Sequence, residues 1–146
     1  MSTAKGLDPE KTAEALHAAA VDLLRKLRRT DAASGLNAPR LSALSVIVFA
    51  GPLTLGQLAD AEQVRPPTMT RIANALEARG LISKITNAND RRAIHISATI
   101  KGKRLLLYAR HRRVASLTSQ IDILPAQDHN TLQAALSIID KLLRSL

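Results

Sequence analysis

The sequence predicts a mainly α-helical protein that carries a small β-hairpin, arranged as a winged helix with further helices at both ends. Two helical patterns, at residues 54–61 and 66–79, are separated by a short break. Two apolar, strand-like runs follow at 81–86 and 93–98, with a polar turn at 87–92 between them. A helix, a turn, a second helix and a hairpin, in this order, make up a winged helix.

Composition limits the classes of protein that fit. The chain has 146 residues and 46% hydrophobic residues, which suits one ordered domain, or one small domain with helical extensions, that shares part of its core with a partner. One Phe and one Tyr are too few for the stacking platforms of single-strand and RNA readers. The absence of Cys excludes disulfides, thiolate metal sites and thiol-based redox sensing.

Hydropathy gives no sign of a membrane segment or a secretory signal. The longest apolar run, 41–50, is about half of what a bilayer span needs. Lys5 and Lys11 are not followed by an apolar segment. We therefore expect a cytoplasmic protein that makes no contact with a membrane.

Positive charge is concentrated in one region. The net charge is +9, and residues 65–104 hold nine basic residues against two acidic ones, Glu77 and Asp90. A solvated surface would also be basic in places, but the coincidence with a helix-turn-helix pattern favours nucleic-acid binding.

The first helix is expected from Pro9 to about Thr30. Asp8 can cap its free amides, and Pro9 suits the first helical position. A narrow apolar face and a basic C-terminal end follow, formed by Ala13, Leu16, Ala20, Leu24 and Leu27 and by Arg25, Lys26, Arg28 and Arg29. Such a helix is expected to pack on the rest of the chain or on a second subunit.

The next helices form the predicted core. A second helix is expected to begin at Asn37 to Pro39 and to end at Gly51-Pro52. It has apolar residues around much of its circumference: Leu41, Leu44, Val48 and Phe49. Thr54 and Gln57 form a capping box, with Leu53 and Leu58 as its hydrophobic staple. Pro66 and Pro67 fit only the first turn of the following helix.

That helix has one apolar stripe and one polar face. Met69, Ile72, Ala73 and Leu76 recur at i, i+3, i+4 and i+7, as expected for a buried face. The other face offers small residues, hydroxyls and one arginine, which suit contacts with phosphates and base edges in a major groove. Its N-terminal amides would also favour phosphate. The candidate contact residues here are Arg65, Pro67, Thr68, Thr70, Arg71 and Asn74.

The hairpin supplies the remaining DNA-contact candidates. Gly80 provides the left-handed residue that ends the helix, and Lys84 lies on the first strand. In the turn, Asp90 either caps the backbone or orients an arginine, so that Arg91 and Arg92 could enter a minor groove. We favour the second interpretation.

Two long helices follow the hairpin. Thr99 is the expected N-cap of a helix from about Ile100 to Gln120, and Pro125 starts a last helix with apolar residues at near-heptad spacing. These two helices and the first helix are each apolar on one side, and a small winged helix alone could not bury all three apolar faces. The sequence thus predicts a homodimer, with residues 1–36 and 100–146 as dimerisation region and 37–99 as DNA-binding domain.

The chain resembles the multiple antibiotic resistance regulator (MarR) family over about residues 9–146. The resemblance rests on an ordered set of motifs: Leu58-Ala59, Thr68-Met69-Thr70-Arg71, Leu76-Glu77, Gly80-Leu81-Ile82, Asp90-Arg91-Arg92, Thr99 and Gly102. It implies a homodimer that binds double-stranded DNA at pseudo-palindromic operators, mostly as a repressor. By position, it places Thr70 and Arg71 on the recognition helix, Asp90 as the wing brace and Arg92 as the minor-groove arginine.

The chain departs from the family pattern in two respects. Where the family commonly caps the recognition helix with Ser, this chain has Arg65 before two prolines, and members that sense oxidants through cysteine are excluded as a guide. The family's other mode, binding a small phenolic or lipophilic acid between the dimer helices and the winged helix, stays open. Candidates for such a pocket are His17, Arg25, Tyr108, His111 and Arg112.

The sequence indicates no enzyme. His17, His95, His111 and His129 lack metal-ligand spacing, so no metal is expected, and no nucleophile elbow, phosphate loop or paired catalytic carboxylates occur. No cofactor is expected. The preferred hypothesis is a dimeric repressor relieved by a small ligand. An architectural DNA-coating protein and a helical protein-interaction adaptor are the alternatives.

Overall fold

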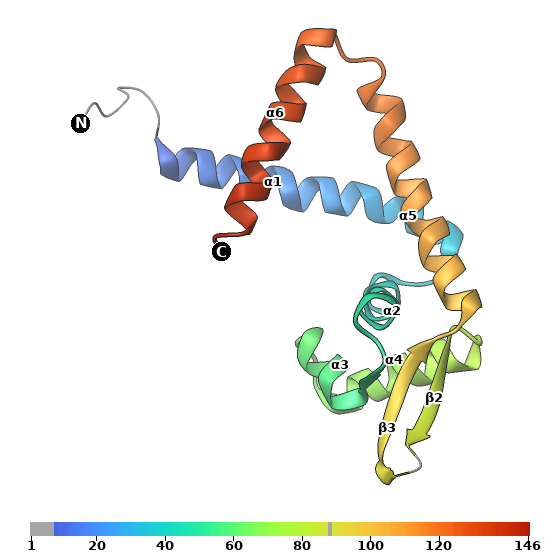
Figure 1. Ribbon diagram of the computed structural model, residues 1–146. Helices are drawn as coiled ribbons and strands as arrows, with labels where there is room; N and C mark the ends of the chain where they lie inside the picture. Colours follow the sequence, from blue (N-terminus) through green and yellow to red (C-terminus); the bar gives the residue numbers. More distant parts are fainter. Residues whose placement is uncertain (1–7, 88) are drawn as a thin grey trace. The chain divides into compact units, whose positions relative to one another are not determined.

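The computed structural model describes residues 8–87 and 89–146; the side chains of Asn87, Asp90, Arg91 and Arg92 lie outside the described part. The chain divides into two compact units, which meet between Arg113 and Val114 within one continuous helix. The elements in order are α1 (Pro9–Arg28), the 3-10 helix η1 (Arg29–Ser34), α2 (Ala38–Ala50), β1 (Leu53–Thr54), α3 (Leu55–Ala61), α4 (Pro66–Ala78), β2 (Ile82–Asn87), β3 (Asp90–Ala98), α5 (Ile100–Ile121) and α6 (Ala126–Leu143) (Figure 1). This confirms the predicted fold class.

The helices begin where the capping residues predict. The Asp8 carboxylate accepts from the amide of Glu10 at 3.1 Å, and the Asn37 side chain accepts from that of Arg40 at 3.1 Å. Thr54 and Gln57 form the reciprocal capping box, with distances of 3.2 Å and 2.9 Å. Side-chain oxygens thus satisfy the amides that each helix start leaves without an intrahelical acceptor.

The core lies around α2, which contacts α3, α4 and β3. Leu44, Ile47, Leu58, Met69 and Leu76 are all less than 2% exposed. The predicted stripe of α4 is confirmed, with Ile72 packed against the core at its edge. Phe49 differs from the expectation: it is 74% exposed because it lies on the side of α2 away from Leu44 and Ile47.

The three-stranded antiparallel sheet has the order β1-β3-β2. Leu53 and Thr54 pair with Ile96 and His95 and form an edge strand that was not predicted. The second hairpin strand was expected from Ala93 but starts at Asp90, which pairs with Asn87. The register then jumps to Thr86 and Ile94, so residues 91–93 form a bulge on β3. The hairpin β2–β3 extends beyond α4 (Figure 1).

Two glycines lie where the hairpin meets α4 and α5. Gly80 ends α4 in the left-handed conformation, with φ of 69°, as predicted. The Thr99 hydroxyl donates to the Gly80 carbonyl at 2.7 Å and accepts from the Gly102 amide at 3.0 Å, which confirms Thr99 as the cap of α5. A Cβ on Gly102 would lie 2.0 Å from the Leu81 carbonyl oxygen, so α5 passes the start of the hairpin in backbone contact.

The helices at the two ends of the chain have no buried residue. On α1, the side chains of Leu16, Val21, Leu23 and Leu24 are 38–54% exposed, and on α6 those of Leu136, Ile138, Leu142 and Leu143 are 47–64% exposed. Both helices therefore present apolar faces that their own unit does not cover.

Candidate nucleic-acid interface

The outer face of α4 is polar and lies opposite its buried stripe. Pro67, Thr68, Thr70, Arg71 and Asn74 are all exposed, as the sequence predicted, whereas Met69, Ala73 and Leu76 are 0% exposed. Glu77 is the one acidic residue of this helix, and Lys84 neutralises it in an ion pair of 2.9 Å. The face that could enter a groove thus carries positive potential.

The N-terminal end of α4 differs from the expected amide-rich phosphate site. Pro66 and Pro67 have no N–H, and the amides of Thr68 and Met69 both donate to the Arg65 carbonyl at 3.0 Å and 3.1 Å. The first turn therefore has few amides left for a phosphate. Arg65 is the N-cap without a side-chain capping bond, and its exposed guanidinium is the group best placed to supply a charge there.

Lys84 links the hairpin to α4. Its ammonium donates to Asn74 Oδ1 at 2.8 Å as well as pairing with Glu77. Of the predicted DNA-contact residues, Lys84 and Asn74 therefore also contact each other, which the sequence did not indicate because they belong to different elements. Asp90, Arg91 and Arg92, predicted for the hairpin tip, have side chains outside the described part.

A second arginine holds the other end of α4. Arg79 follows the helix and donates to the Gly35 carbonyl at 2.7 Å and to the Ser34 carbonyl at 3.5 Å. This fixes α4 against the turn after η1. Lys101 donates to the Arg79 carbonyl at 2.8 Å, so α5 contacts the same corner.

η1 is also tied to α5 by a buried ion pair. Asp31 is 4% exposed, and both its oxygens accept from Arg113, at 2.7 Å from Nε and 2.5 Å from Nη2. This hydrogen bonding to Asp31 raises the pKa of Arg113 above its ordinary value and outweighs the opposing effect of burial. Arg113 thus stays charged around neutral pH.

A cavity of about 370 Å³ lies beside this ion pair. Its lining combines apolar side chains, two serines and three arginines: Leu24, Arg28, Ala38, Leu41, Ser42, Ser45, Phe49, Leu106, Leu107, Ala109, Arg110 and Arg113. Such a lining suits a small molecule with an apolar body and a negative group.

The predicted pocket residues lie on α1 and α5, two of the three helices that line this cavity, but do not line it themselves. Arg25 pairs with Asp22 on α1, and Arg112 stacks 5.9 Å from the ring centre of Tyr108 on α5. His17 and His111 are exposed. Leu24 and Arg110, each one residue away from a predicted position, line the cavity because neighbouring helical residues point about 100° apart.

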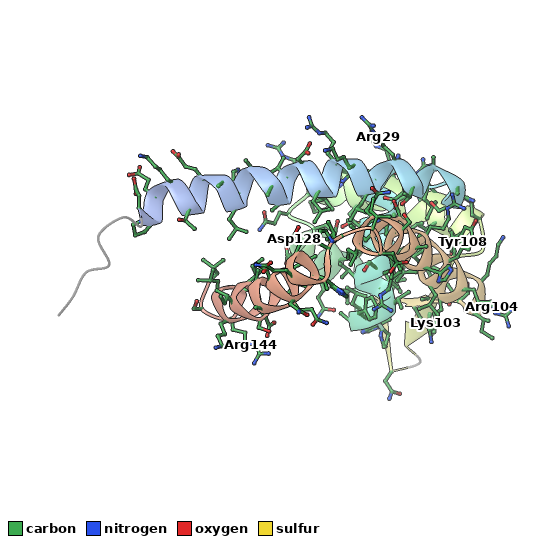
Figure 2. All side chains as sticks on the ribbon, turned by 90° about the horizontal axis from the view of Figure 1, so that it is seen from above. Arg29, Lys103, Arg104, Tyr108, Asp128 and Arg144 are labelled. Atoms are coloured by element: carbon green, nitrogen blue, oxygen red, sulfur yellow. The ribbon has the colours of Figure 1, made fainter. Side chains whose placement is uncertain are left out.

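Basic side chains continue along the outer surface of α5. Lys103 and Arg104 extend away from the helix, as Figure 2 shows. Within the described part of the chain, no three His, Cys, Asp or Glu side chains come together as a metal site. No single helix there is both long enough and apolar enough to cross a membrane.

Comparison with known proteins agrees with this geometry. The sequence profile of the MarR family matches residues 36–94, which span α2 to the hairpin. An uncharacterized HTH-type transcriptional regulator of Mycobacterium bovis is 30% identical over 129 residues, covering 88% of this chain and 90% of its own length. The HTH-type transcriptional repressor MdtR of Bacillus subtilis is 32% identical over 68 residues, 47% of this chain and 44% of its own length.

A solved structure shows the same fold. A mutant of MepR from S. aureus, bound to an oligodeoxyribonucleotide, superposes with a TM-score of 0.71 at 18% identity, covering 90% of this chain and 97% of that one. Fold, polar helix face and relatives define a DNA-binding transcriptional regulator of the winged-helix class, and not an enzyme. The chain belongs to the MarR family.

Proposed function

We propose that this protein is a homodimeric repressor that binds a palindromic operator and is released from it by a small aromatic or lipophilic ligand. The observation that carries the proposal is the exposed outer face of α4, with Arg71 and Asn74 free of the core and its one carboxylate neutralised by Lys84. A helix of this kind can lie in a major groove without meeting repulsion from the phosphates.

In this proposal, the base and phosphate contacts come from α4 and the hairpin. Arg71 has the forked donors that suit guanine N7 and O6, and Arg65, Pro67, Thr68 and Thr70 lie around it toward the N-terminal end. Arg92, braced by Asp90 and accompanied by Arg91, would enter the adjacent minor groove, as the resemblance to the family implies.

A dimer would present this face twice. The uncovered apolar faces of α1 and α6 support residues 1–36 and 100–146 as the dimerisation region, because such faces are costly to leave in water. Two recognition helices about 34 Å apart would fit successive turns of one DNA face. The similarity to MdtR, a transcriptional repressor, supports repression as the direction of control.

The ligand would occupy the cavity between α1, α2 and α5. Arg28 and Arg110 would bind its anionic group, because Arg113 is already paired with Asp31, and Phe49 and Leu107 would cover its apolar body. A ligand can release DNA only if it binds a dimer geometry that is wrong for the operator more tightly than the right one.

Fluorescence anisotropy with DNA fragments selected from a random pool tests the proposal. Affinity should fall steeply between low and high salt, and Arg71→Ala should weaken specific binding by about tenfold or more. Arg29→Ala, with the same charge change on η1, is the control. A selectivity near one over random DNA would favour the architectural alternative, and a folded dimer with no DNA affinity would favour the adaptor.

A screen with aromatic carboxylic acids tests the ligand. Compounds that raise the melting temperature should lower operator affinity in the same order. Arg110→Ala should weaken both effects, because it removes one of the cavity's cations. Stabilisation without any loss of DNA binding would contradict relief by this cavity.

A further inference from the structure

Two polar side chains occupy the middle of the outer face of α4. Pro67, Arg71, Asn74 and Ala78 recur at i, i+4, i+7 and i+11, on the side opposite Met69, Ala73 and Leu76. Arg71 and Asn74 are thus neighbours on this centre line. If the middle of this helix faces a base pair, Arg71 and Asn74 are the side chains nearest to it.

The structure fixes how the Asn74 amide is presented. The Lys84 ammonium can only donate, so the atom it contacts at 2.8 Å is the amide oxygen, Oδ1. Glu77 holds the same ammonium at 2.9 Å, and the Lys84 side chain is only 30% exposed. The ammonium takes one of the two lone pairs of this oxygen and holds the oxygen toward the hairpin, so the two N–H donors of Nδ2 are turned away from Lys84 and toward a ligand.

This matters because asparagine reads adenine with both ends of its amide. The adenine edge has an acceptor, N7, beside a donor, the N6 amino group, and the asparagine oxygen must accept from N6. Guanine presents two acceptors, N7 and O6, at the same positions. An asparagine whose oxygen is held by a lysine, with its N–H donors toward the base, matches guanine better than adenine, because the adenine amino group then faces donors instead of an acceptor.

We propose that Asn74, oriented by Lys84, is a specificity-determining residue that selects guanine over adenine at one base pair of each half-site. This inference rests on the proposed function, in which α4 enters the major groove. Lys84 is a positioning residue: it acts through Asn74, and it also neutralises Glu77, whose carboxylate would otherwise face the phosphates.

The test is selection of bound sequences from random double-stranded DNA, followed by anisotropy with all four base pairs at each selected position. Wild type should prefer guanine over adenine at one position per half-site. Lys84→Met frees the Asn74 oxygen, so the guanine-to-adenine preference there should fall about tenfold or reverse. Lys103→Met, on the outer surface of α5, removes the same charge and should lower affinity without changing any preference.

Two further variants separate positioning from a general loss of structure. Asn74→Ala should abolish the guanine preference at that position alone, and adding it to Lys84→Met should remove any gain for adenine. Circular dichroism reports whether each variant is folded. If Lys84→Met binds with the wild-type preference at every position, or if Asn74→Ala changes none, the inference is overturned while DNA binding stands. If the wild type selects no sequence, both the inference and the proposed repressor are overturned.

Discussion

The winged helix and the helices at the chain ends are held together in different ways. In the winged helix, α2, α3, α4 and the sheet surround side chains that are completely removed from solvent, such as Leu44 and Leu58. Neither α1 nor α6 buries one residue. One region is therefore complete within a single chain, whereas the other leaves its apolar faces for something else to cover.

Polar contacts show the same division. In the winged helix and the segments that adjoin it, η1 and α5 up to Arg113, they connect distant parts of the chain: Arg79 reaches back to Gly35, and Arg113 to Asp31. Along the end helices the ion pairs are between residues three or four positions apart, as in Asp22 with Lys26 and Asp140 with Arg144. Long-range contacts fix tertiary structure, and short-range ones support only the helix that contains them.

The largest effect is expected from truncation in the buried region. Leu44→Ala should lower the free energy of unfolding by about 2–5 kcal/mol, because it leaves a cavity among fully buried neighbours. Urea denaturation measures this. Ile100→Ala, at a position 70% exposed, should change it by less than about 0.5 kcal/mol. Equal losses would contradict the description of the core.

Next in size is the loss of Arg113. Arg113→Ala leaves Asp31 buried without its partner and should cost about 3 kcal/mol, the low end for a buried pair because the arginine side chain is 32% exposed. Urea denaturation again measures it, with Arg112→Ala as the control on the same helix. Since the pKa of Arg113 is raised, its contribution would be lost only as the pH rises through that raised value, so stability around neutral pH should not change through titration of Arg113.

A smaller effect is expected where the apolar faces are uncovered. Leu143→Ala, at a residue 64% exposed in one chain, should weaken dimerisation by about 1–2 kcal/mol per subunit while leaving far-ultraviolet circular dichroism unchanged. Sedimentation across a dilution series measures the dissociation constant. A wild-type protein that stays monomeric at every concentration would remove the dimer from the proposal.

The smallest effect belongs to Asp22. Hydrogen bonds from Lys26, and then from Arg25, lower its pKa from 3.8 to about 2. A lowered pKa means that the contribution is present above about pH 4 and is lost as the pH falls toward 2. Carboxyl NMR titration should show this midpoint. Asp22→Asn should reduce helicity slightly at neutral pH and not at all at the acid end.

Features that depend on neighbouring residues could be predicted from the sequence. Asp8, Thr54, Gly80 and Thr99 act on amides or dihedral angles within three residues, so composition and spacing were enough to find the helix boundaries. The apolar stripe of α4 was predictable for the same reason, because helical periodicity determines it.

Features that depend on pairing across the chain were missed. β1 exists only because Leu53 and Thr54 meet β3, more than 40 residues later, and the early start of β3 depends on the pairing of Asp90 with Asn87. The contacts of Lys84 with Asn74 and of Arg113 with Asp31 join different elements. The residues that line the cavity depend on which side of each helix faces it, and residue type alone does not predict this.

Gly102 shows how close packing between a helix and the hairpin limits which residues a position can accept. Alanine is a better helix former than glycine by about 1 kcal/mol, so a Gly-to-Ala substitution inside a helix ordinarily stabilises it. Here the added methyl group would meet the Leu81 carbonyl oxygen at 2.0 Å and the Leu44 side chain at 3.3 Å. A larger residue at 102 therefore requires the hairpin and the helix to move apart first, so we expect glycine to be retained at this position in relatives that pack the two elements in the same way.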